Sequence, residues 1–133
     1  MARTDIRHLT VPDLFPPPGY AHAAIATGAR LILTAGAVPL DERGNLIGPG
    51  DYTAQTRQVI DNLLRQLSAS GARAGNVLKT TVYVAATSQA DLGAVWRVVE
   101  DSPLAPAAST LLGVAMLGYP GQLVEIEAVA AQP

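Results

Sequence analysis

The stretch that decides the fold class is residues 53–84, which read TAQTRQVIDNLLRQLSAS, GARAGN and VLKTTVYV in direct succession. The first part carries one apolar stripe at helical spacing, which predicts a helix over residues 53–70. The stripe consists of Val59, Ile60, Leu63, Leu64 and Leu67. Asp51 is suited to cap the first turn of this helix, and Gly71 is suited to end it. Residues 77–84 are rich in β-branched side chains and predict a strand.

A second helix is expected over residues 89–100, where Leu92, Val95 and Val99 share one face and Ser88 is suited to cap the first turn. Beyond it, Pro103 and Pro106 prevent the helix from continuing. Residues 109–117 and 123–130 then predict the last two strands, which a turn at residues 118–121 joins.

Upstream of the first helix, residues 20–25 and 30–35 flank a short turn centred on Gly28 and predict a β-hairpin. Glycine and proline are frequent in residues 36–50, which predicts a loop with a brief strand at residues 45–47. Residues 1–17 are expected to form an extended arm, because the prolines that follow Phe15 cannot continue a helix.

The expected order is therefore β-β-α-β-α-β-β in a single domain of 133 residues. This order favours an α/β (α+β) fold, with one sheet and two helices packed on one of its faces. Residues 123–130 alternate between two faces: Ile126 belongs to one, and Glu125 and Glu127 belong to the other. Only 15% of the residues are charged, which is low for a small monomer. We therefore expect self-association to cover the second sheet face.

The composition argues against several classes of function. A formal net charge of −2 gives no electrostatic basis for binding nucleic acid or an anionic membrane. Cysteine is absent and His8 and His22 are the only histidines, so we expect neither thiol chemistry nor a metal site. No apolar run approaches the ~20 residues of a membrane span, and the N-terminus lacks the apolar core of a signal peptide. We expect a cytoplasmic protein without a cofactor.

Several segments together resemble the RidA (YjgF) family of reactive-intermediate deaminases. They are residues 18–23 (PGYAHA), 33–41 (LTAGAVPLD), 55–58 (QTRQ) with 62–63 (NL), 77–84 (VLKTTVYV) and 124–130 (VEIEAVA). The similarity runs in the family's order from about residue 18 to residue 130, which is nearly the whole chain. No single segment is diagnostic, but the set is specific.

The resemblance implies a chorismate-mutase-like fold and a homotrimer whose sheets line a central, barrel-like core. It also implies three small-molecule pockets at the subunit boundaries. Active members of the family hydrolyse enamines and imines of amino acids to 2-oxo acids and ammonia. In these members an arginine in a Pro-Ala-Arg-Ser motif holds the substrate carboxylate, and a glutamate on the last strand positions water.

The chain departs from this pattern at the arginine. Ala108 stands there, or Ser109 if the register shifts by one residue, and neither can form a bidentate bond to a carboxylate. Ala35 replaces a serine of the family, and Trp96 replaces an asparagine. The last-strand glutamate is retained as Glu125, and the pocket tyrosine as Tyr20.

The resemblance makes Glu125 and Tyr20 the candidate catalytic residues. The candidate ligand-binding residues are Ala35, Gly36, Trp96, Ala108, Ser109, Thr110 and His22. Two functions stay open: hydrolysis of a small enamine, imine or related carbonyl compound, and non-catalytic binding or sensing of a small metabolite by the trimer. A nuclease function, attached to some relatives, is disfavoured by the acidic net charge.

Overall fold

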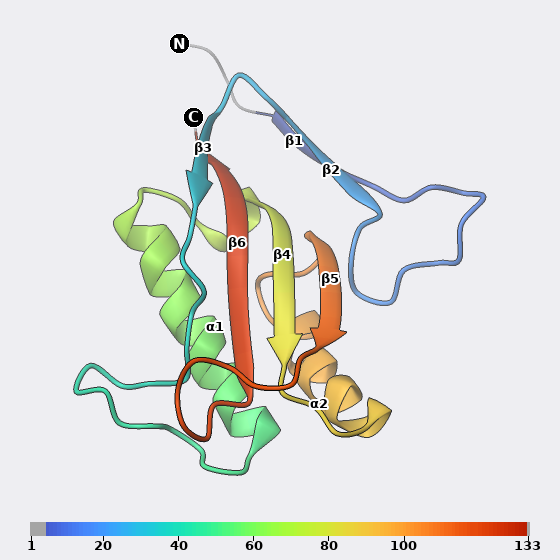
Figure 1. Ribbon diagram of the computed structural model, residues 1–133. Coiled ribbons are helices and arrows are strands. Elements are labelled where there is room, and N and C mark those ends of the chain that lie inside the picture. The colour runs from blue at the N-terminus through green and yellow to red at the C-terminus, as the bar shows by residue number, and fades with distance from the viewer. Residues whose placement is uncertain (1–4, 133) are drawn as a thin grey trace.

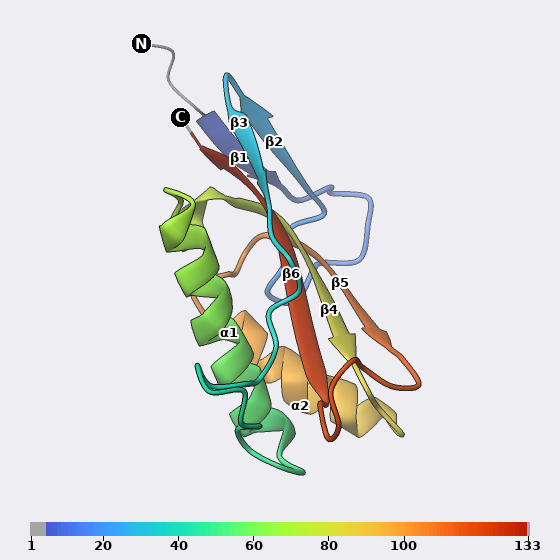
Figure 2. The same ribbon diagram turned by 60° about the vertical axis from the view of Figure 1, so that its left-hand side comes forward.

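A computed structural model describes residues 5–132 of the chain. The strands are β1 (Asp5–Leu9), β2 (Ala23–Thr27), β3 (Arg30–Leu33), β4 (Val77–Val84), β5 (Ala108–Gly113) and β6 (Val124–Gln132). The helices are α1 (Tyr52–Ala69), α2 (Gln89–Glu100) and the short 3-10 helix η1 (Ala74–Asn76). One sheet has the strand order β3-β6-β4-β5, and β1 pairs with β2 separately (Figure 1). Both α-helices pack on one face of the four-stranded sheet (Figure 2), which confirms the expected α/β class.

The two helices begin and end where their sequence signals predict. The Asp51 side chain accepts a hydrogen bond from the Ala54 amide at 3.0 Å and caps α1. Gly71 follows the end of α1 with a φ of 84°, a left-handed conformation that glycine adopts without strain. Ser88 caps α2 through the Asp91 amide at 3.4 Å. Predictions from periodicity and capping are reliable here because both signals are local in the sequence.

The prediction that residues 20–25 and 30–35 form a hairpin is wrong. Gly28, with a φ of 65°, does turn the chain between β2 and β3, but the two strands belong to different sheets. β2 pairs antiparallel with β1, and β3 pairs antiparallel with the end of β6, from Leu33 opposite Val129 to Arg30 opposite Gln132. β1 and β6 thus supply the backbone hydrogen bonds that β2 and β3 would have made to each other in a hairpin.

The N-terminal arm is also more structured than expected, since β1 lies within it; residues 1–4 lie outside the described residues. The His8 ring nitrogen Nε2 lies 3.4 Å from the carbonyl oxygen of Val77, so this segment contacts β4. Two other boundaries differ. The strand expected over residues 109–117 ends at Gly113, and the brief strand at residues 45–47 is reduced to one bridge between Leu40 and Leu46.

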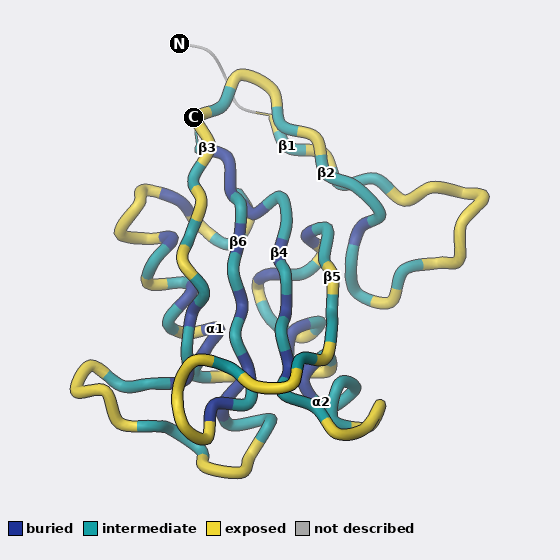
Figure 3. Tube along the Cα trace, viewed as in Figure 1, coloured by how far each residue is buried: buried dark blue, intermediate teal, exposed yellow. Residues whose placement is uncertain are grey.

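β6 presents the two faces that its alternation predicts. Val124, Ile126, Ala128 and Ala130 are buried beneath the helices, where Leu63 and Leu67 of α1 are also fully buried. On the other face of β6, Glu125, Glu127 and Val129 are only half-buried (Figure 3). Its neighbour on β3, Leu33, leaves 74% of its surface exposed. Within residues 5–132, neither α-helix combines the length and apolar character that crossing a membrane requires.

Candidate functional site

Tyr20 and Trp96 form two walls of a pocket of about 290 Å³ beside β5. Pro18, Ser109 and Leu111 complete its lining. The two rings meet edge to face, with centroids 6.0 Å apart and planes at 76°. The indole Nε1 of Trp96 donates a hydrogen bond to the carbonyl oxygen of Pro18 at 2.9 Å, which fixes the orientation of the ring. None of the five lining residues carries a charge, so the pocket suits the flat, neutral part of a ligand.

The segment that carries Tyr20 is held against the start of β5. The Ala21 amide donates to the carbonyl oxygen of Ala107 at 3.3 Å, and Ala21 forms a parallel bridge with Ala108. Ala21 is therefore buried, and its neighbours Tyr20 and His22 form an edge-to-face ring pair with centroids 6.1 Å apart. After Ala108, the edge of β5 that faces away from β4 has no strand partner among the described residues.

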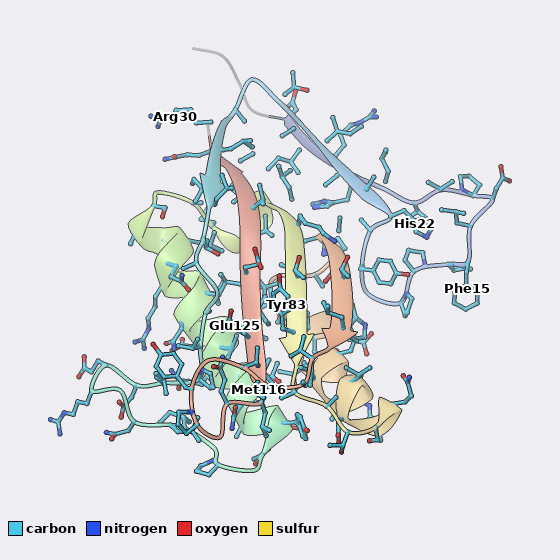
Figure 4. All side chains as sticks on the ribbon, in the orientation of Figure 1. Phe15, His22, Arg30, Tyr83, Met116 and Glu125 are labelled. Atoms are coloured by element: carbon cyan, nitrogen blue, oxygen red, sulfur yellow. The ribbon has the colours of Figure 1, made fainter. Side chains whose placement is uncertain are left out.

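His22 organises the loop that precedes it. Its Nδ1 accepts a hydrogen bond from the Val11 amide at 2.9 Å, and its Nε2 lies 3.0 Å from the carbonyl oxygen of Phe15. Since an amide must donate to Nδ1, the proton of the neutral ring resides on Nε2 and is donated to Phe15. Figure 4 shows His22 and Phe15 in the loop that projects beside the sheet. Both polar atoms of His22 are thus occupied by main-chain groups.

Glu125 lies on the open face of the sheet, where two neighbours fix its carboxylate. The Gln122 side chain is buried and donates from Nε2 to Oε1 of Glu125 at 3.1 Å. Gly36 packs directly against the same side chain: a Cβ at this position would lie 2.2 Å from Oε2 of Glu125. The segment after β3 brings Gly36 there, because the Ala37 amide donates to the carbonyl oxygen of Ile126 at 2.7 Å.

Tyr83 and Glu127 form a second polar pair on the open face (Figure 4). The Tyr83 hydroxyl donates to Oε1 of Glu127, and Tyr83 lies opposite Glu125 in the β4–β6 register. This hydrogen bond to Glu127, with burial and the negative charges of Glu127 and Glu125, raises the pKa of the Tyr83 phenol. Tyr83 was not predicted as a site residue, although the alternation of residues 77–84 places it on this face.

Residues 108–110 alternate between the two faces. Ser109 points to the helix side, where its hydroxyl accepts a hydrogen bond from Thr80 at 2.8 Å. Thr110 points to the open face, where its hydroxyl lies 2.5 Å from Nζ of Lys79. Burial lowers the pKa of Lys79. Ala35 is exposed, and its carbonyl oxygen accepts a hydrogen bond from Gln66 at 3.2 Å.

The candidate residues therefore form two groups on opposite faces of the sheet. Tyr20, Trp96 and Ser109 meet in the pocket beside β5, whereas Glu125 and Gly36 meet on the open face of β6. β4 separates β6 from β5, so one chain does not bring the carboxylate and the pocket together. Among the described residues, no group of three His, Asp or Glu side chains is placed to hold a metal ion.

Comparison with known proteins identifies relatives along nearly the whole chain. A family model described as endoribonuclease L-PSP matches residues 14–132. A RutC family protein of Synechocystis is 36% identical over 119 residues, which cover 88% of this chain and 89% of that one. The crystal structure of a Rid-family protein of unknown function from Yersinia pestis superposes with a TM-score of 0.86 at 34% identity, covering 96% of this chain and 98% of that one.

One relative carries the name of an activity. The 2-iminobutanoate/2-iminopropanoate deaminase of Escherichia coli is 36% identical over 55 residues, or 41% of this chain. This alignment covers 42% of the length of the Escherichia coli protein.

Proposed function

We propose that this chain, which belongs to the endoribonuclease L-PSP (YjgF/RidA) family, binds a small imine or enamine and hydrolyses it to a carbonyl compound and ammonia. The proposal rests on two parts of a site that one protomer carries, the Tyr20–Trp96 pocket and the Glu125 carboxylate. We call each of these parts a half-site. The Tyr20–Trp96 pocket offers two aromatic walls for a planar C=N or C=C group. Glu125 offers a carboxylate whose position Gln122 and Gly36 restrict.

A second copy of the chain is needed to complete such a site. The pocket lies beside the unpaired edge of β5, and Glu125 lies on the sheet face opposite the helices (Figure 2). Placing the β5 edge of one protomer against the open face of the next brings the two half-sites together. The homotrimer that the family resemblance implies closes this arrangement with three equivalent sites. Sedimentation equilibrium tests it, and a stable monomer of 13.8 kDa would overturn it.

In this site the Glu125 carboxylate acts as the general base. It accepts a proton from water as the water oxygen bonds to the imine carbon, and the same proton then passes to the nitrogen. The carboxylate then accepts the hydroxyl proton of the resulting carbinolamine and passes it to the nitrogen as the C–N bond breaks, which releases ammonia and leaves the carbonyl product. The rings of Tyr20 and Trp96 hold the planar C=N group, and Gln122 keeps the carboxylate aligned.

The experiment generates imines from several amino acids with an amino-acid oxidase and follows the release of the carbonyl product. We expect Glu125→Gln to lower the catalysed rate by ~100-fold or more, the usual contribution of a general base. Glu127→Gln is the matched control, because Glu127 lies on the same strand and face but is occupied by Tyr83. Equal rates for the wild type and Glu125→Gln would refute the assignment of Glu125.

A second candidate is a trimer that binds a small metabolite without catalysis. It is favoured by the hydrogen bonds that already restrain Trp96 and Glu125, since both groups could serve as fixed binding surfaces. In that case a ligand would raise the melting temperature of the protein without any turnover. RNA cleavage is disfavoured, because Glu125 and Glu127 place negative charge on the open face.

A further inference from the structure

A groove of about 420 Å³ lies between α1 and α2, and it shares no lining residue with the Tyr20–Trp96 pocket. Each helix contributes residues three, four or seven positions apart, which share one helix face. Its lining consists of Thr53, Arg57 and Ile60 from α1, Ala94, Arg97 and Val98 from α2, and Asp101 and Ser102 directly after α2. Ile60 is buried, whereas Arg57 and Arg97 are exposed. The groove thus has an apolar floor and a charged rim.

The two rim arginines have no partner within residues 5–132. Arg65, also on α1, shows the alternative, because its Nη2 lies 3.0 Å from Oδ2 of Asp61. Arg57 and Arg97 form no such ion pair and no side-chain hydrogen bond with any described residue. Two like charges that line one groove repel each other, and each guanidinium offers five N–H donors. This arrangement favours a ligand that brings two anionic groups.

Asp101 adds one negative charge to the same rim. It directly follows the end of α2, one turn beyond Arg97, yet its carboxylate also forms no ion pair or hydrogen bond with a described residue. The Ser102 hydroxyl is engaged, since it donates to the carbonyl oxygen of Val99 at 2.6 Å. The groove therefore carries two positive charges and one negative charge, although the net charge of the chain is −2.

We propose that this groove binds an acidic α-amino acid. The two carboxylates of such a ligand match Arg57 and Arg97, its ammonium group matches Asp101, and its aliphatic chain covers the apolar floor. A volume of about 420 Å³ lies within the usual range of small-molecule sites. The helices lie on the sheet face opposite the one that a second copy would cover (Figure 2), so the groove stays accessible in an oligomer. This site is independent of the proposed imine site.

The test compares three ligands by titration calorimetry on the full chain at constant ionic strength. L-Glutamate carries all three charges, L-glutamine replaces the side-chain carboxylate by an uncharged amide of the same shape, and glutarate lacks the ammonium group. We expect glutamate to bind about fivefold more tightly than either analogue, the upper value for one solvent-exposed ion pair. Trp96 is the single tryptophan and directly precedes Arg97 on α2, so its fluorescence gives a second readout.

Four variants assign the contacts. Arg57→Met and Arg97→Met should each weaken glutamate binding about fivefold, because each removes one ion pair. Asp101→Asn should weaken the binding of glutamate but not that of glutarate, which has no ammonium group to lose. Arg65→Met is the matched control, because it removes an exposed arginine of α1 that pairs with Asp61 and lies outside the groove. It should leave glutamate binding unchanged.

Four outcomes would overturn the inference, and each leaves the proposed imine site standing. The first is a wild type that does not bind glutamate saturably. The second is equal affinity for glutamate and either analogue, which would show that one of the three charges is not recognised. The third is an Arg65→Met variant that loses as much affinity as Arg57→Met, because the effect would then come from net charge alone. The fourth is inorganic phosphate that binds more tightly than glutamate at the same ionic strength, which would make the groove a general anion site.

Discussion

Replacing Gly36 by alanine tests the placement of Glu125 without touching the carboxylate itself. A Cβ at Gly36 would lie 2.2 Å from Oε2 and 2.5 Å from Cδ of Glu125. Ordinary contacts begin near 3.4 Å, so the carboxylate must move by about 1 Å. Such a shift breaks the 3.1 Å hydrogen bond from Gln122. The φ of Gly36 lies outside the left-handed region, so backbone strain adds nothing to the effect.

The expected magnitude follows from two opposing contributions. Losing a hydrogen bond to a charged group destabilises the fold by about 1.5–3 kcal/mol. Alanine in place of glycine stabilises it by about 0.4–1 kcal/mol, because the unfolded chain has less freedom. Gly36→Ala alone should therefore lower the free energy of unfolding by about 1–2 kcal/mol. In a Glu125→Ala background the clash is absent, and the same substitution should raise stability by about 0.4–1 kcal/mol.

Urea unfolding of the wild type, both single variants and the double variant measures this reversal of sign, and their coupling energy should be about 1–3 kcal/mol. All four proteins must be compared at one concentration, since self-association would shift every midpoint. The imine assay on Gly36→Ala adds a functional measurement. The rate of imine hydrolysis should fall, because the carboxylate of Glu125 is displaced. Additive effects in the double variant would show that Gly36 and Glu125 are not in contact and would refute the reasoning.

Three further predictions concern residues that hold the site in place. Gln55 is fully buried and binds three main-chain groups, two through Nε2 and one through Oε1, so Gln55→Leu should destabilise the fold by about 2–4 kcal/mol in urea unfolding; a loss below about 0.5 kcal/mol would contradict these bonds. His22→Ala removes both contacts that organise its loop, so chymotrypsin should cleave faster after Leu14, which is 54% exposed; unchanged cleavage would contradict the loop role. The hydrogen bond to Glu127 raises the pKa of Tyr83, so the unfolded chain releases this proton first and stability should fall as pH rises above about 10. Tyr83→Phe should lessen that fall, and an identical pH profile would refute it.

The grouping of site residues that was predicted comes from the family resemblance, whereas the contacts that were not predicted depend on strand order and register. Tyr20, Trp96 and Ser109 were expected together, and they line one pocket. The separation of Glu125 from that pocket could not be foreseen, because it depends on β4 lying between β6 and β5 in the sheet. The contact between Lys79 and Thr110 depends on the parallel β4–β5 register, which local sequence patterns do not specify.

The sequence by itself determined the features that arise from neighbouring residues. α1 and α2, their caps at Asp51 and Ser88, and the two faces of β6 all follow from side-chain periodicity and hydrogen bonding within a few residues. Only the tertiary structure decided which strands pair. The turn at Gly28 has the local pattern of a hairpin, yet β2 pairs with β1 and β3 with β6. A strand edge can bind any compatible strand that the fold brings alongside, so its partner is chosen by the packing of the whole chain.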